Sequence, residues 1–150
     1  MITLPPDFKD FLRLLNGHKV EFLLVGGYAV ALHGYVRYTA DMDIWVMTSP
    51  ENAAKMILAL KDFGVPQAEE LHNVFLLEKR VLGMGMPPYK IEVVTTIDGV
   101  SFDECFANRM TADIDGICVP YLSLSDLRKN KKASGRYKDL NDLDHLPEEE

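Results

Sequence analysis

The segment from Leu24 to Val46 constrains the fold of this chain more than any other part of the sequence. An apolar run ends there in Gly26 and Gly27, and Asp41 and Asp43 open a second run in which apolar and other residues alternate. A short apolar run that stops at glycines predicts a buried strand, and alternation predicts a strand with one buried face. The residues after the glycine pair predict a short helix, so the segment predicts a strand–helix–strand unit.

The two aspartates are the most informative side chains of this unit. Residues two apart on a strand point to the same face, so Asp41 and Asp43 lie about 7 Å apart. Like charges at that distance raise each other's pKa unless a cation lies between them. A hard divalent metal, bound through one or two carboxylates and substrate phosphates, removes this conflict. Gly26 and Gly27 can bring backbone N–H groups close to a phosphate. The unit therefore predicts metal-dependent chemistry on a nucleotide.

The spacing resembles the signature of the nucleotidyltransferase superfamily of polymerase-beta-like fold: an apolar residue, Gly-Gly, thirteen residues, then Asp-apolar-Asp-apolar. Within that superfamily, Arg37-x-Thr39-x-Asp41-x-Asp43 is similar to small bacterial nucleotidyltransferase-like proteins that include abortive-infection toxins of the AbiEii type. Residues 85–100 and 130–140 are similar to the same group. The resemblance covers roughly residues 20–146, and it does not specify a substrate.

The resemblance implies a catalytic and metal-binding set of Asp41, Asp43 and Glu92. These carboxylates would hold two Mg²⁺ ions, with Mn²⁺ as a substitute, one activating the attacking hydroxyl and one neutralising the triphosphate. Glu92 is the lone acid of a strand expected over residues 90–97, whereas the similar proteins more often have aspartate at this position. The alternative for Glu92 is an exposed side chain on an edge strand.

The resemblance also implies a nucleotide-binding set that begins with Gly26 and Gly27, whose N–H groups would bind the β- and γ-phosphates. Many superfamily members have serine as the second residue, and Gly27 has no hydroxyl to offer. Arg37 and Thr39 alternate with Asp41 on the approach to the strand. Arg37 would contact the triphosphate or orient the carboxylates; a salt bridge that pins the loop is an equal alternative.

A basic cluster completes the nucleotide-binding set with Lys131 and Lys138, which the resemblance places at the mouth of the site. Six of the sixteen basic residues fall within residues 128–138 of a chain with net charge −7. The net charge argues against non-specific coating of nucleic acid, and a local basic surface suits an anionic small molecule or an RNA end. The alternative is a solvated helix face.

The order of apolar patterns predicts an α/β (α+β) domain over residues 1–150, with a mixed sheet flanked by helices. The two terminal helices, within residues 123–146, are expected to pack around the edge of the sheet. The patterns predict helices near residues 8–17, 28–33, 50–63, 102–107, 123–133 and 138–146, and strands near residues 21–25, 41–47, 74–82, 90–97 and 114–122, the last interrupted by a turn at Asp115-Gly116.

These features predict an enzyme that moves a nucleoside monophosphate from an NTP such as ATP to a hydroxyl acceptor and releases pyrophosphate. The resemblance to toxins suggests an RNA or tRNA end or a protein as acceptor, and a cognate antitoxin as partner. Two alternatives stay open: an antibiotic-type enzyme that modifies a small-molecule alcohol, and a non-catalytic nucleotide-binding relic. We expect a cytoplasmic protein without membrane association, because no apolar run approaches about 20 residues.

Overall fold

The computed structural model describes residues 2–148 of the chain, which leaves residues 1, 149 and 150 of the expected domain outside the described range. None of the helices in this range has the length and apolarity needed to cross a membrane. Along the chain the elements are α1 (Pro6–Gly17), β1 (Phe22–Val25), α2 (Gly26–Leu32), β2 (Met42–Val46), α3 (Pro50–Phe63), the 3₁₀ helix η1 (Ala68–Leu76), β3 (Val81–Met86), β4 (Tyr89–Val94), α4 (Phe102–Ala107), β5 (Met110–Ile114), β6 (Ile117–Tyr121), α5 (Leu124–Ser134) and α6 (Tyr137–His145).

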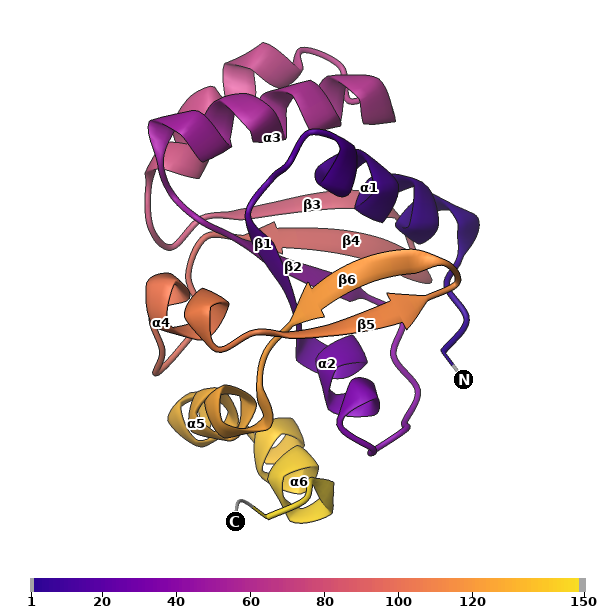
Figure 1. Ribbon diagram of the computed structural model, residues 1–150, viewed down its shortest axis with the longest axis vertical. Helices are drawn as coiled ribbons and strands as arrows, with labels where there is room; N and C mark the ends of the chain where they lie inside the picture. Colours follow the sequence, from indigo (N-terminus) through magenta and orange to yellow (C-terminus); the bar gives the residue numbers. More distant parts are fainter. Residues whose placement is uncertain (1, 149–150) are drawn as a thin grey trace.

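The strands form one six-stranded sheet in the order β3-β4-β2-β1-β6-β5. Strand β2 runs parallel to β4, and β1 runs parallel to β6, while the remaining neighbours are antiparallel. Helices lie on both sides of this sheet (Figure 1). The mixed sheet flanked by helices that the sequence predicts is confirmed.

Several elements begin and end where local sequence chemistry predicts. Ser49 caps α3 by accepting a hydrogen bond from the backbone N–H of Asn52, Pro50 occupies the first turn, and Gly64 ends the helix in a left-handed conformation. Ser123 caps α5 by accepting from the N–H of Asp126 in the same way. Local capping therefore determines both ends of α3 and the start of α5.

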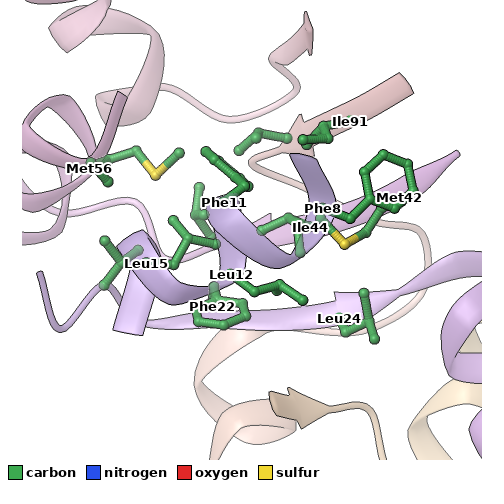
Figure 2. Close-up of a cluster of buried hydrophobic side chains, with 14 of the residues drawn as sticks. Phe8, Phe11, Leu12, Leu15, Phe22, Leu24, Met42, Ile44, Met56 and Ile91 are labelled. Atoms are coloured by element: carbon green, nitrogen blue, oxygen red, sulfur yellow. The ribbon is translucent and has the colours of Figure 1, made fainter. Parts of the chain in front are cut away.

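One face of the sheet carries the larger core. Helices α1 and α3 cover this face, with the apolar stripe of α1 lying over β1 and β2 (Figures 1 and 2). Each fully buried Leu or Phe side chain stabilises the fold by roughly 1.5–3 kcal/mol relative to its exposed state. The buried residues in Figure 2 include Phe8, Phe11, Leu12, Leu15, Phe22, Leu24, Met42, Ile44, Met56 and Ile91.

A second core covers the opposite face and corrects the expected position of the terminal helices. Leu23 and Val25 of β1 point to this face, where they pack with Trp45, with Leu127 of α5 and with Leu146 after α6. Strand β1 is buried along its whole length, so both faces of the sheet centre need cover. Helices α5 and α6 therefore pack beneath a face of the sheet instead of around its edge (Figure 1).

The strand expected over residues 74–82 was wrong in detail, whereas the turn expected at Asp115-Gly116 is confirmed, with β6 following it. Residues 74–76 belong to η1, which buries Ala68 and Phe75 against the larger core, and the strand starts only at Val81. Strand β3 extends through Gly83 and Gly85, where a connection was expected; glycines are tolerated on this edge strand. Residues 110–121 form a hairpin of two strands, β5 and β6. The sequence did not predict β5, because this edge strand is mostly exposed and its apolar pattern is weak.

Candidate functional site

The glycine pair lies where β1 passes into α2, next to the aspartate strand. Gly26 has a positive φ of 66°, and a Cβ at this position would lie 2.2 Å from Oδ2 of Asp43. A Cβ on Gly27 would lie 2.5 Å from Oγ1 of Thr39. Asp43 or Thr39 would have to shift before either glycine could carry a side chain, so glycine allows the backbone to lie directly against these two residues.

Two of the predicted carboxylates are direct neighbours in the sheet. Asp43 of β2 is the register partner of Glu92 of the parallel strand β4, and of Val25 on its other side. Asp41 lies immediately before β2. The strand carrying Glu92 is therefore internal, and the alternative of an exposed glutamate on an edge strand does not hold.

The electrostatics of this group match the repulsion expected from the sequence. Burial raises the pKa of Asp43 to about 6, and the nearby charge of Glu92, hydrogen bonding with Glu92 and the charge of Asp41 act in the same direction. Lys138 lowers the pKa of Asp43 in part. At neutral pH Asp43 is therefore mostly ionised at a site where negative charge is unfavourable, and the group favours a bound cation.

All predicted site residues except Gly27 line one cavity of about 600 Å³, which we call the carboxylate pocket. Gly27 is buried behind the wall, against Thr39. The predicted residues on the wall are Gly26, Arg37, Thr39, Asp41, Asp43, Glu92, Lys131 and Lys138. Segments far apart in the sequence thus meet around one space, although their roles stay predictions.

Lys131 and Arg37 line the pocket, but both already form ion pairs with carboxylates of α6, which the sequence did not predict. Arg37 donates from Nε and Nη2 to the two carboxylate oxygens of Asp142, at 2.7 and 2.9 Å. The Lys131 ammonium lies 3.1 Å from Asp139 and 3.0 Å from Asp142. Arg136 also pairs with Asp139, at 2.8 Å. Of the roles expected for Arg37, the structure therefore shows the salt bridge that holds the loop before β2.

The centre of this ion network is buried, although the Arg136 side chain at its edge is 70% exposed. The side chains of Asp139, Asp142 and Lys131 are at most 5% exposed. Burial alone would raise the pKa of Asp142, but hydrogen bonds from Arg37 and Lys131 hold that pKa below its ordinary value. Removing one partner from such a group costs about 3–5 kcal/mol. The network therefore fastens α6 and α5 to the loop that carries Arg37 and Thr39.

The sequence did not predict Asp142, nor the wall of the carboxylate pocket formed by Asp98, Asn130 and Ser134, which we call the far wall. Asp142 lies three residues after Asp139, so both acids share one face of α6, a spacing that could have indicated it. The far wall is held by hydrogen bonds to Asp98: Asn130 donates to its carbonyl at 2.9 Å, and Ser134 donates to its carboxylate at 3.1 Å. No periodicity pairs these positions, since they come from a loop and a helix.

The donor set fits magnesium held jointly with a substrate. Within residues 2–148, no three His, Cys, Asp or Glu side chains are grouped so that they could hold a metal ion by themselves. Asp43 and Glu92 nevertheless offer adjacent carboxylates, and Asp41 opens on the same pocket. Mg²⁺ is commonly bound through only one or two carboxylates, with water and substrate phosphates completing the octahedron. The residues therefore fit an ion that arrives with a nucleotide.

Solved structures similar to this chain include two that are described as nucleotidyltransferases or nucleotidyltransferase-like. A candidate nucleotidyltransferase from Thermotoga maritima is 17% identical, with a TM-score of 0.64 over 95% of this chain and 94% of that one. An antigenic nucleotidyltransferase-like protein from Paracoccidioides brasiliensis is 15% identical, with a TM-score of 0.53 over 91% of this chain and 72% of that one. The chain has a nucleotidyltransferase-like fold. At these identities the likeness concerns the fold alone, and neither a protein-family model nor a curated protein matches the chain.

Proposed function

We propose that the chain is a Mg²⁺-dependent nucleotidyltransferase that moves a nucleoside monophosphate from an NTP to a hydroxyl acceptor. The observation that carries this proposal is the pairing of Asp43 with Glu92 across two parallel strands, directly beside the close approach of Gly26. The backbone at Gly26 carries no side chain that would keep a phosphate away, and the carboxylates beside it repel one another. Both features on one wall of the pocket suit a metal–triphosphate complex. The nucleotidyltransferase-like fold supports the same reaction class.

Asp41, Asp43 and Glu92 would hold the Mg²⁺ ions. When bound, Mg²⁺ polarises the α-phosphate, lowers the pKa of the attacking hydroxyl and neutralises the leaving pyrophosphate. The chain's own contribution is positioning, which dominates catalysis of phosphoryl and nucleotidyl transfer. The N–H groups of the glycine pair would bind the β- and γ-phosphates, and the rigid β2–β4 pairing would keep Asp43 and Glu92 at a constant separation.

The cations of the pocket divide into two roles in this proposal. Lys138 is exposed on the pocket wall and its charge reaches Asp43, so we assign it to the phosphates. Lys131 and Arg37 already face buried carboxylates, so their main role would be to hold α6 and the Thr39 loop in place. A triphosphate could still attract both through space, because both line the pocket.

The test of this proposal is transfer of label from an NTP. The protein is incubated with each α-labelled NTP, Mg²⁺ and either total cellular RNA or a small-molecule extract, and the products are separated on gels and by chromatography. Label in an RNA band or in one small molecule, absent with Asp43→Asn, supports the proposal. Mg²⁺-dependent NTP binding by calorimetry without any transfer would favour the non-catalytic alternative. No NTP binding would overturn the proposal.

The relation to abortive-infection toxins stays part of this proposal. The AbiEii-type pattern, Arg37-x-Thr39 before the aspartates, suggests a cytoplasmic toxin with an antitoxin partner and a tRNA or protein acceptor. Expression of the chain alone, followed by growth measurement, tests it directly. Growth arrest that depends on Asp43 would support a toxin, and normal growth at high expression would argue against one.

A further inference from the structure

A second cavity of about 600 Å³ adjoins the carboxylate pocket. Its walls are residues 3–7 before and within the first turn of α1, the tyrosines at positions 28, 38 and 89, and Thr39. Tyr38 and Thr39 line both cavities, so the two cavities meet at these residues. We call this second cavity the tyrosine cleft.

Two of the three tyrosines of the cleft, Tyr28 and Tyr89, are held in place by Phe8. Phe8 of α1 meets Tyr28 edge-to-face, with ring centroids 6.0 Å apart, and meets Tyr89 in the same way at 6.3 Å. Tyr28 is 5% exposed, whereas Tyr89 and Tyr38 are 52% and 77% exposed. One ring is therefore embedded in the core and two present their surfaces to the cleft, an arrangement suited to a planar ring.

The three tyrosines are also close enough to influence one another. Burial raises the pKa of Tyr28, and Tyr89 and Tyr38 raise it further. The phenol of Tyr28 is consequently neutral at physiological pH, and a tyrosine hydroxyl can donate or accept a hydrogen bond. The cleft thus combines apolar ring surfaces with a few neutral polar groups, the usual composition of a small-molecule site.

The charge of the tyrosine cleft disfavours phosphates. Within residues 2–148, no lysine or arginine lines it, and the charged group on its wall is the carboxylate of Asp7 in the first turn of α1. The carboxylate pocket, by contrast, is lined by Arg37, Lys131, Arg136 and Lys138. A phosphodiester would meet repulsion in the cleft without a compensating cation, whereas a neutral or positively charged group would not.

We infer that the tyrosine cleft binds the acceptor, a small alcohol or phenol that carries a planar ring and no negative charge. This inference rests on the proposed function and decides between its open acceptors. The donor NTP occupies the carboxylate pocket, and the acceptor hydroxyl reaches the α-phosphorus past Thr39. Its oxygen forms a bond to phosphorus, the bond to the β-phosphate oxygen breaks, pyrophosphate leaves, and the acceptor proton passes to water.

Three phenols of matched shape and different charge test the inference: tyramine (positive), tyrosol (neutral) and 4-hydroxyphenylacetate (negative). Their binding to the full chain is measured by ligand-observed NMR without nucleotide. Tyramine and tyrosol should bind, and 4-hydroxyphenylacetate should bind at least tenfold more weakly. Tyr89→Leu should weaken tyrosol at least tenfold, because it removes an exposed ring face. Tyramine should bind more tightly than tyrosol, because the Asp7 carboxylate attracts its ammonium group, and Asp7→Asn should remove this difference.

Tyr137→Leu is the matched control, since Tyr137 is 94% exposed on α6 and lines neither cavity. Absence of tyrosol and tyramine binding, equal binding of the anion, or the same loss in Tyr89→Leu and Tyr137→Leu would overturn the inference. Displacement of tyrosol by a single-stranded uridine oligonucleotide would overturn it in favour of an RNA base. Tyrosol binding in a protein that binds no Mg²⁺·NTP would support the site while overturning the proposed function.

Discussion

Asp142 accepts hydrogen bonds from Arg37 on both of its carboxylate oxygens, at 2.7 and 2.9 Å, although the two residues lie 105 positions apart in the sequence. The same carboxylate lies 3.0 Å from the ammonium of Lys131, so one buried acid joins α6, α5 and the loop before β2. A bidentate pair of this kind determines orientation as well as distance. The wall of the carboxylate pocket is therefore rigid only while α6 stays docked.

Asp142→Asn should destabilise the protein by about 3–5 kcal/mol, because Lys131 and Arg37 lose the charge that compensates them in a buried site. Asp144→Asn, at an exposed position of the same helix, should change the free energy of unfolding by less than about 0.5 kcal/mol. Urea unfolding followed by circular dichroism measures both. Equal effects of the two variants would mean that the network does not hold α6.

Gly26→Ala should abolish Mg²⁺·NTP binding and destabilise the fold, since its Cβ would lie 2.2 Å from the Asp43 carboxylate. Gly34→Ala separates this clash from backbone strain: Gly34 also has a positive φ, 110°, but a Cβ there meets nothing within 4 Å. The control should cost about 1 kcal/mol and bind NTP normally. Calorimetry and thermal unfolding of the two variants decide the matter, and normal NTP binding by Gly26→Ala would contradict the assignment.

Asp43→Asn should stabilise the metal-free protein at neutral pH. The folded protein holds the Asp43 proton more tightly than the unfolded chain, because its pKa rises from 3.8 to about 6. The wild type therefore loses stability as pH rises through this window, and the variant does not. Unfolding in EDTA should show an advantage for the variant that grows between pH 4 and 6, reaches at most about 3 kcal/mol and stays constant above pH 7. A pH-independent difference would contradict this.

Glu92→Gln should lower turnover a hundredfold or more, on the order of 3 kcal/mol of transition-state stabilisation, and spare most of the NTP affinity. The expectation follows from its place opposite Asp43, where it completes the carboxylate group. Glu92→Asp should retain activity, because aspartate is the commoner residue in similar proteins. Single-turnover kinetics and calorimetry separate the two effects; a loss confined to NTP affinity would assign Glu92 to binding instead.

Lys138→Ala should weaken NTP binding about tenfold, since it removes an exposed cation of the pocket wall. Lys132→Ala is the control, because Lys132 is also exposed but lies outside this pocket. Lys131→Ala should act differently and mainly reduce stability, as it leaves Asp139 and Asp142 buried without their shared cation. NTP titrations with the three variants measure this, and indistinguishable affinities would remove Lys138 from the phosphate site.

Much of the fold and part of the site could be predicted because the signals are local. Ser49, Pro50 and Gly64 determine the ends of α3 through hydrogen bonds and backbone conformations within a few residues. The glycine pair and Asp41-x-Asp43 likewise act through strand alternation and steric freedom. The strand expected over residues 74–82 failed, because apolar residues there are used by η1 to cover the larger core.

The sequence by itself determined which residues could carry charge, turn sharply or alternate along a strand. Only the tertiary structure decided that Lys131 and Arg37 face Asp142, and that Tyr28, Tyr38 and Tyr89 surround one cleft. The physical reason is that these partners lie on segments brought together by burial of the two cores. Periodicity describes which face of an element is apolar, but it does not say which distant side chain will meet that face or compensate a buried charge.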